Sequence, residues 1–258
     1  MATTRIADIA YLPGGSARHT LDLYLPEPPP PAAVPLAVYV HGGAWRVGDK
    51  GEFGAVAEGL IAAAPGRQLA VAAVNYELAV RHPAHVDSAA AAVRFLATDR
   101  SYPGQRAVDR ARVFLVGHSA GAHLAALMTL APGHEGIGPI RGVVGLGGLY
   151  DIPALLDEYP DYRDFVDPAF GADDRAAASP ACIAAHMRDD ARRTRFLVVH
   201  STGDELVGPA QAIGFAAQLM RAGHSDVTLA ARDLGGHDAA PLSAGFWQLV
   251  CSLIFTSS

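Results

Sequence analysis

The sequence has only two cysteines, Cys182 and Cys251, among its 258 residues, and they form no CxxC pair. A multi-disulfide framework is therefore excluded. One disulfide could still form, but we expect two reduced thiols in a cytoplasmic protein. The N-terminal segment lacks the apolar core of a secretory signal. No window of about 18 uninterrupted apolar residues is present, so we expect no membrane span.

Basic charge is also scarce, with 20 Lys and Arg against 26 Asp and Glu and a net charge of -6. The basic residues are scattered along the chain, which argues against a nucleic-acid partner. Metal-binding motifs such as HExxH are missing as well. His82 and His85 in "RHPAH" could hold a metal, but loop histidines without further ligands are the simpler interpretation. We therefore expect no metal and no cofactor.

What the sequence does contain is a regular alternation of apolar strand-like runs and alanine-rich helical segments. The strand-like runs are 36–40, 69–76, 112–117, 141–148, 195–201 and 226–233, and the helical segments are 53–64, 86–98, 120–131, 209–222 and 239–254. Continuously apolar strands alternating with helices predict a mostly parallel sheet with helices on both faces. Two earlier segments, "RIADIAYL" and "HTLDLYL", alternate in polarity and predict an antiparallel pair at the sheet edge. We thus expect an α/β fold with eight strands, in a single domain over 1–258.

Residues 149–194 interrupt this alternation with a long, aromatic and acidic segment between two predicted strands. Long excursions inside compact domains often serve as lids or binding loops. A plain surface insertion is the alternative. We expect a lid-like insertion with helical fragments.

The segment "VGHSAGAHL", 116–124, places Ser119 in a G-x-S-x-G turn between a predicted strand and a predicted helix. Glycines on both sides allow the strand and helix to approach closely, and the turn lifts the serine hydroxyl above the carboxyl edge of the sheet. A serine hydroxyl needs a neighbouring base, and that base needs an orienting carboxylate. Ser119 is therefore a candidate nucleophile whose partners should follow other strands.

Among eleven histidines, His237 in "LGGHD" directly follows the last predicted strand, so it is the candidate base. Asp204 in "HSTGDEL" follows the preceding strand and is the favoured acid. Its neighbour Glu205 and the earlier Asp151, after "GLGGLY", remain alternatives. The order Ser119, Asp204, His237 is the chain order of the α/β-hydrolase arrangement.

A third requirement is a set of backbone N–H groups that bind a negative oxygen, and "HGGAW" ends a predicted strand with two glycines. Backbone amides can face a reacting centre where side chains are small or absent. We expect the N–H groups of Gly43, Ala44 and Ala120 to form this oxyanion hole.

Together, "HGGAWRVGDK", "VNYELA", "VGHSAGAHLAAL", "GGLYDI" and "GDELVGPAQ" resemble the α/β-hydrolase superfamily, over nearly the whole chain. Within it they are most similar to the branch of kynurenine formamidases and hormone-sensitive-lipase-like esterases. "HGGAW" resembles the formamidase HGGxW pattern more than the HGGG of esterases, whereas "NYELAV" departs from the NYRLAP common among relatives. The resemblance implies the same triad and the same oxyanion hole.

The expected activity is hydrolysis of an aryl formamide such as N-formyl-kynurenine, or of a short-chain or aryl ester, through an acyl-enzyme. Trp45, His118 and Tyr150 are the expected substrate contacts, with Tyr159, Tyr162 and Phe165 also near the mouth. A non-catalytic binding protein on a hydrolase scaffold is the alternative from another functional class. The expected partner is a small molecule, and a homodimer is left open.

Overall fold

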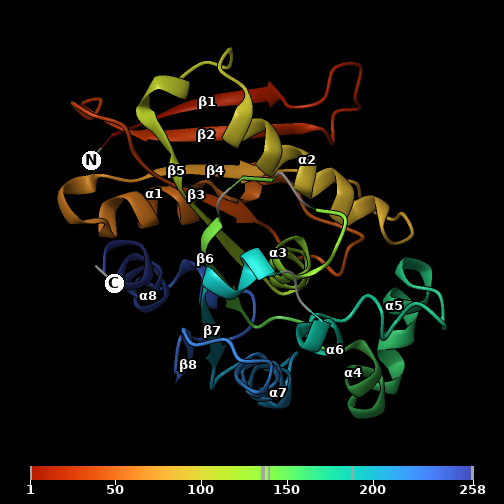
Figure 1. Cartoon of the computed structure of the whole chain (residues 1–258). Helices are drawn as coiled ribbons and strands as arrows, with labels where there is room; N and C mark the ends of the chain where they lie inside the picture. Colours follow the sequence, from red (N-terminus) through yellow and green to blue (C-terminus); the bar gives the residue numbers. More distant parts are fainter. Residues whose placement is uncertain (1, 135–136, 139, 187–188, 257–258) are drawn as a thin grey trace.

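Eight strands form one sheet in the order β1-β2-β4-β3-β5-β6-β7-β8 (Figure 1). The structure is a computed structural model that describes residues 2–134, 137–138, 140–186 and 189–256. The strands are β1 (Thr3–Ala10), β2 (Thr20–Pro26), β3 (Val34–Val40), β4 (Ala70–Val74), β5 (Val108–His118), β6 (Ile140–Leu146), β7 (Arg195–Ser201) and β8 (Val227–Arg232).

The pairs from β4 to β8 are parallel, whereas β1 pairs with β2 and β2 pairs with β4 in antiparallel register. The predicted antiparallel pair at the N-terminal edge is therefore present. Parallel pairing brings the carboxyl ends of β3 and β5 to β8 to one edge of the sheet, where Val40 aligns with Gly117, and His118 with Leu146.

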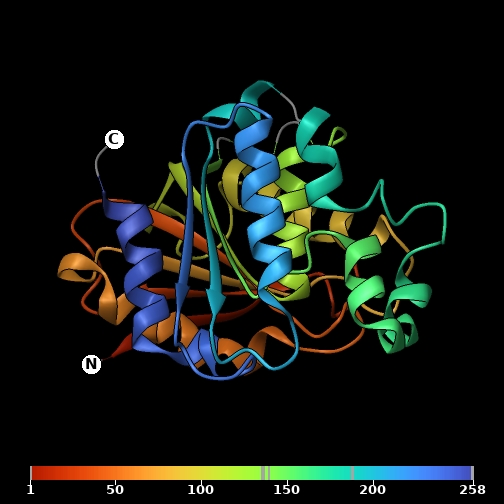
Figure 2. The same cartoon turned by 90° about the horizontal axis from the view of Figure 1, so that it is seen from below.

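Helices cover both faces of the sheet, as the apolar strands require. Figures 1 and 2 show α1 and α8 on one face and α2, α3 and α7 on the other. Every residue of β3 is buried, because it lies between these two layers. The helices are α1 (Gly54–Ala63), α2 (Ala84–Thr98), α3 (Ala120–Leu130), α4 (Ile152–Glu158), α5 (Arg163–Ala169), α6 (Pro180–Ile183), α7 (Pro209–Arg221) and α8 (Ala244–Phe255). No helix in the described part of the chain is both long and apolar enough to cross a bilayer.

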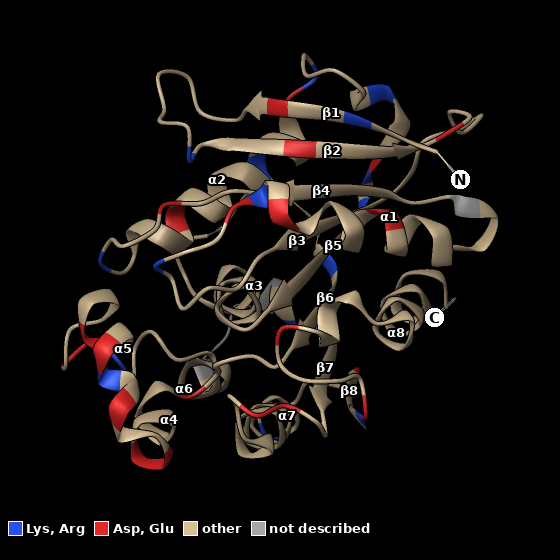
Figure 3. Cartoon of the chain, turned by 180° about the vertical axis from the view of Figure 1, so that it is seen from behind, with Lys and Arg blue, Asp and Glu red and all other residues tan. Residues whose placement is uncertain are grey.

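The predicted excursion between β6 and β7 contains α4, α5 and α6, together with short 3-10 turns. Asp151 caps α4 by accepting a hydrogen bond from the N–H of Ala154 at 3.0 Å. Figure 3 shows acidic positions on α4 and α5, while Lys and Arg are spread over several elements. The excursion thus forms a small helical unit beside the carboxyl edge of the sheet.

An ionic network centred on the buried side chains of Lys50 and Asp22 ties the N-terminal strands to the segment that follows β3. Lys50 Nζ lies 2.7 Å from Asp8 Oδ1 and 2.8 Å from Asp22 Oδ1. Arg5 contacts the other oxygen of Asp22 at 2.6 Å, and the Asp22 side chain is fully buried. These contacts fix the end of the loop that begins with His41.

Candidate active site

Ser119 lies at the turn between β5 and α3 with φ 53 and ψ -121. This left-handed backbone is strained for a residue with a side chain, and such strain gathers at functional sites. Its N–H donates to the carbonyl of Leu146 at 2.9 Å, which holds the turn against β6. A Cβ at Gly117 would collide with the α3 backbone, and one at Gly121 with the carbonyl of Val40, so both positions require glycine.

His237 and Asp204 meet beside this turn. Asp204 lies in the loop after β7, and His237 lies in the loop after β8. His237 Nδ1 is 2.8 Å from Asp204 Oδ2, and both side chains are at most 5% exposed. A Cβ at Gly147 would approach both of them, since it would come within 2.9 Å of Asp204 Oδ2 and 3.2 Å of His237 Cε1.

The two alternative acids occupy other positions. Asp151 caps α4. Glu205 accepts a hydrogen bond from the backbone N–H of His237 at 3.0 Å, so it supports the loop rather than the imidazole. The structure therefore brings Asp204, and neither alternative, to the His237 ring.

Asp204 is held in its charged form. Burial would raise its pKa, but hydrogen bonds from His237 and from the backbone N–H groups of Val207 and Leu206 lower the pKa below its usual value. A charged Asp204 fixes the Nδ1–H tautomer of His237 and leaves Nε2 as the proton acceptor.

The loop after β3 approaches Ser119 closely, because a Cβ at Gly42 would lie 3.1 Å from the Cβ of Ser119. Gly43, Ala44 and Trp45 follow with φ values of 105, 51 and 57. Within the described residues, the N–H groups of Gly43 and Ala44 donate to no backbone or side-chain acceptor. The N–H of Ala120 is the first of α3 and has no partner inside the helix. These three amides are free to bind an oxygen.

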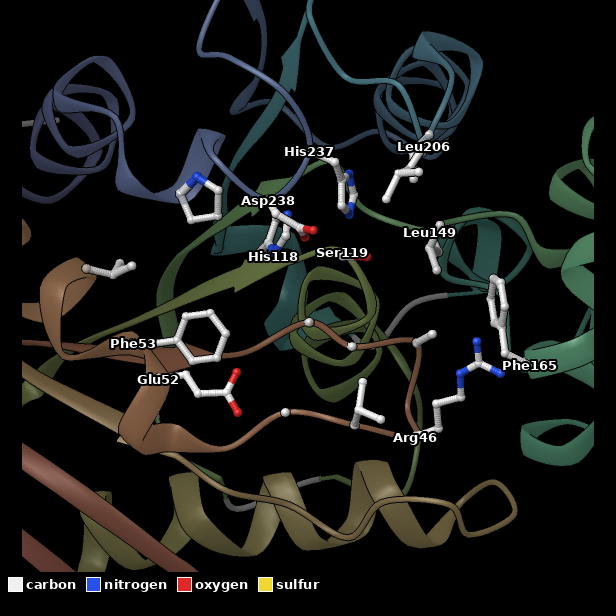
Figure 4. A pocket seen from close by; sticks show the side chains of 18 of the residues that line it. Arg46, Glu52, Phe53, His118, Ser119, Leu149, Phe165, Leu206, His237 and Asp238 are labelled. Carbon is white, nitrogen blue, oxygen red and sulfur yellow. The ribbon is translucent and has the colours of Figure 1, made fainter.

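Ser119 and His237 both line a cavity of about 660 Å³, shown in Figure 4. Phe53, Leu149, Tyr162, Phe165 and Leu206 form apolar walls, with Glu52, Asp238 and Arg46 also facing the space. Arg46 contacts Asp164 of α5 at 2.7 Å, and Tyr162 Oη donates to the carbonyl of Leu206 at 2.7 Å. The insertion thus supplies part of the cavity wall.

His118, an expected substrate contact, also lines this cavity. Its ring centroid lies 4.5 Å from that of His237. Burial first, and then the nearby His237, lower the pKa of His118 to about 3. His118 is therefore neutral at physiological pH and adds no positive charge beside the candidate base.

The other two expected substrate contacts, Trp45 and Tyr150, are not among the residues that line the cavity. Trp45 is 1% exposed and packs edge-on against His123 and Phe170. Tyr150 is 1% exposed and stacks on Phe215, with the two ring centroids 4.2 Å apart. Both rings therefore pack in the core and do not face the cavity. The expectation that both contact substrate is not supported, because neither ring lines the cavity that holds Ser119 and His237.

Sequence reasoning also missed several lining residues. Phe53 lies shortly after the "GDK" segment, Leu206 lies two residues after the candidate acid, and Asp238 directly follows the candidate base. Their place in loops after strand ends was a usable signal. Tyr162 and Phe165 line the cavity as expected, while Tyr159 stacks on Tyr162 behind it. Among the described residues, no group of three His, Cys, Asp or Glu side chains could hold a metal ion.

Comparison with known proteins also points to a hydrolase. A family model described as BD-FAE matches residues 21–219. The chain is similar to a kynurenine formamidase from Meyerozyma guilliermondii, with 36% identity over 185 residues that cover 67% of each protein. It is also similar to a kynurenine formamidase from Danio rerio, with 33% identity over 61% of this chain and 50% of that protein.

Among solved structures, a truncated carbohydrate esterase from gut microbiota superposes with a TM-score of 0.79 at 17% identity, covering 97% of this chain and 95% of that one. At this identity the likeness concerns the fold. The predicted α/β-hydrolase fold, with its mostly parallel eight-stranded sheet, is confirmed. The resemblance to the kynurenine formamidase and esterase branch is confirmed as well.

Proposed function

The chain belongs to the BD-FAE family, and on this premise we propose that it is a serine hydrolase that cleaves an aryl formamide or a carboxylic ester. The observation that carries the proposal is the 2.8 Å contact between Asp204 and His237 beside the strained Ser119 turn. Side chains from three distant segments meet at one cavity, in the chain order of the α/β-hydrolase arrangement.

The proposed reaction begins when His237 Nε2 accepts the proton of Ser119 Oγ as that oxygen attacks the substrate carbonyl carbon. The carbonyl oxygen becomes an oxyanion, and the N–H groups of Gly43, Ala44 and Ala120 bind it. His237 then gives the proton to the leaving amine or alcohol as the carbon–heteroatom bond breaks. Water attacks the acyl-enzyme by the same route, which releases the acid and restores Ser119.

The neutral state of His118 supports this role of His237. During the reaction His237 carries a positive charge, which Asp204 stabilises at 2.8 Å. A second charge on His118, whose ring lies 4.5 Å away, would oppose that state. Burial of His118 removes this repulsion.

An aryl formamide of the N-formyl-kynurenine type is our first substrate assignment. It is supported by the names of the similar kynurenine formamidases. It is also supported by the rings of Phe53, Tyr162 and Phe165 around a cavity large enough for a small aromatic molecule.

An aryl or short-chain carboxylic ester is the second assignment. The apolar side chains of Val47, Leu206 and Leu242 line the cavity and are 41% to 59% exposed, so an acyl or alkyl group could pack on them. Direct comparison of turnover of N-formyl-kynurenine with that of p-nitrophenyl acetate and butyrate separates the two assignments.

The nucleophile assignment has its own test. Ser119→Ala should lower kcat by about 10⁴-fold or more for every substrate, because no acyl-enzyme can form. The melting temperature should fall little, since the substitution removes only the hydroxyl oxygen of a residue that lines the cavity. Retention of full activity by a folded Ser119→Ala variant would refute the nucleophile. A wild-type protein that turns over none of these substrates would favour the non-catalytic binding protein instead.

The remaining expectations belong to the same proposal. We take residues 1–258 as one catalytic domain, with 149–194 as a lid-like wall of the cavity, supported by Tyr162 and Phe165 facing the space. A cytoplasmic location is in keeping with Cys182 and Cys251, which are both free. A homodimer remains a prediction that light scattering tests.

A further inference from the structure

His123 joins three parts of the molecule through two hydrogen bonds. Its Nδ1 accepts from Trp45 Nε1 at 3.3 Å, and its Nε2 lies 2.8 Å from the carbonyl oxygen of Ala178. Trp45 belongs to the loop after β3, His123 to α3, and Ala178 to the insertion between β6 and β7. The reaction proposed above uses none of these side chains.

The two partners determine the protonation of the His123 ring. An indole N–H can only donate, so Nδ1 must be the unprotonated acceptor. A carbonyl oxygen can only accept, so Nε2 must carry the proton. His123 is fully buried, and burial together with the nearby His85 lowers its pKa well below the usual value. One neutral tautomer therefore satisfies both contacts.

This arrangement bears directly on the candidate oxyanion hole. Gly43 and Ala44 immediately precede Trp45, and both Ala44 and Trp45 adopt left-handed backbone that is costly for residues with a Cβ. Such a conformation persists only where surrounding contacts hold it. Here Trp45 is held by burial, by its indole bond to His123, and by its carbonyl, which accepts from the N–H of Ala79 at 2.9 Å.

The helix connection supplies the geometric link. His123 lies one helical turn beyond Ser119, and its N–H donates to the carbonyl of Ser119 at 3.2 Å. The amide of Ala120 begins the same helix. One imidazole thus ties the loop that carries two amide donors to the helix that carries the nucleophile and the third donor.

From this geometry we infer that His123 is a positioning residue, which acts through Trp45 to hold the Gly43 and Ala44 amides at the oxyanion of the Ser119 adduct. The inference rests on the proposed function, because an oxyanion forms only if Ser119 attacks a carbonyl. It gives the histidine of "HSAGAHL" and the tryptophan of "HGGAW" a shared role, since their hydrogen bond holds the loop against the helix.

Two substitutions separate the two hydrogen bonds. His123→Gln places an amide near the position of Nε2, where it can donate to Ala178 but offers Trp45 no acceptor. His123→Asn places an amide oxygen near the position of Nδ1, where it can accept from Trp45. Trp45→Phe keeps an aromatic ring and removes the donor.

We expect His123→Gln and Trp45→Phe each to lower kcat for p-nitrophenyl acetate by about tenfold or more, because displaced amides stabilise the transition state less. KM should stay within about threefold, because the cavity walls are unchanged. His123→Asn should recover most of the lost kcat. The double variant Trp45→Phe with His123→Gln should be no slower than the slower single variant, since both remove the same contact.

Inhibition by a trifluoromethyl ketone distinguishes positioning of the amides from a role in stability alone, because loss of stability alone would leave the inhibition constant unchanged. Ser119 adds to this ketone to form an oxyanion adduct, so its inhibition constant should weaken by the same factor as kcat/KM in each variant. His224→Asn is the matched control, since His224 is also a buried histidine, with its ring centroid 5.1 Å from that of Phe196. His224 lies just before β8, at the amino end of that strand and away from the carboxyl edge that carries the candidate site. The substitution should change the melting temperature but not kcat.

Three outcomes would overturn the positioning role: unchanged kcat in folded His123→Gln and Trp45→Phe, equal losses in His123→Gln and His123→Asn, or additive losses in the double variant. If His123→Gln fails to fold, Trp45→Phe and His123→Asn still decide the matter by their difference in kcat. Failure of the proposed function is distinguishable, because wild-type protein would then turn over neither p-nitrophenyl esters nor N-formyl-kynurenine and would form no ketone adduct.

Discussion

Asp204 illustrates how single residues set the chemistry of this cavity. Its Oδ2 contacts His237 Nδ1 at 2.8 Å, while its Oδ1 accepts from the N–H groups of Leu206 and Val207 at 3.0 and 2.9 Å. These donors outweigh the effect of burial and keep the pKa of Asp204 below its usual value. The carboxylate therefore stays charged at neutral pH.

Asp204→Asn should lower kcat by about 10⁴-fold, because the amide no longer selects the Nδ1–H tautomer of His237. Steady-state kinetics with p-nitrophenyl acetate measures this loss. Glu205→Gln is the matched control, since its amide oxygen can still accept from the N–H of His237. A loss below tenfold in Asp204→Asn would contradict the assignment of the acid.

At the residue scale, the sequence predicted that Ser119, Asp204 and His237 lie at one edge of the sheet, and the structure places each of them after a strand that ends there. Side-chain direction was a harder problem. Trp45 and Tyr150 also follow strands, yet their rings pack in the core, Trp45 against His123 and Phe170 and Tyr150 on Phe215. These contacts join residues distant in sequence, so no local pattern of residue types encodes them.

The loop after β3 is the element on which the site depends most, and the ionic network at its far end anchors it. The Lys50 side chain is 5% exposed and that of Asp22 is fully buried. Their contacts lower the pKa of Asp22 and raise the pKa of Lys50, in each case against the opposing effect of burial. The network thus joins β2 to the segment that carries Gly43 and Ala44.

Lys50→Met should lower the free energy of unfolding by about 3 kcal/mol at pH 7, because Asp22 loses a buried partner. Since the folded pKa of Asp22 is depressed, its contribution is present above the unfolded value and is lost as the pH falls through the folded value. Urea unfolding should therefore show a smaller difference between Lys50→Met and wild type at acidic pH. Exposed Arg94→Met is the control. A Lys50→Met protein as stable as the control would contradict the anchoring role.

Element boundaries show a second limit of sequence patterns. A helix over 239–254 was expected, but α8 begins at Ala244, because a 3-10 turn at Ala240–Leu242 comes first and Ser243 caps the helix by accepting from the N–H of Phe246 at 3.1 Å. The missed turn matters for the cavity, since Pro241 and Leu242 line it. In a sequence, capping and turn residues are a weaker signal of where a helix begins than apolar periodicity is of the helix itself.

At the scale of the whole molecule, the cavity is assembled from segments that follow β3, β5, β6, β7 and β8. The strand–helix alternation was enough to predict this convergence, because parallel strands share a carboxyl edge. The sequence predicted that the insertion lies near the mouth, but not the contacts that hold it there, such as Arg46 with Asp164 and Tyr162 with Leu206, because these join residues distant in sequence.

The contribution of the insertion can be measured through Phe165. Phe165→Ala should raise KM for p-nitrophenyl esters and for N-formyl-kynurenine by about fivefold, while kcat changes little, because it removes uniform apolar contact with the substrate. Ile213→Ala, an exposed position on α7 outside the cavity lining, is the control. An unchanged KM in Phe165→Ala would mean that substrate binds elsewhere in the cavity.

The convergence of Ser119 with the Asp204–His237 pair is tested most directly by labelling the folded protein with a fluorophosphonate probe and mapping the adduct by mass spectrometry. We expect one adduct, on Ser119, and a labelling rate that falls by orders of magnitude in His237→Ala. An adduct on another residue, or equally fast labelling of Ser119 without the imidazole of His237, would contradict the account.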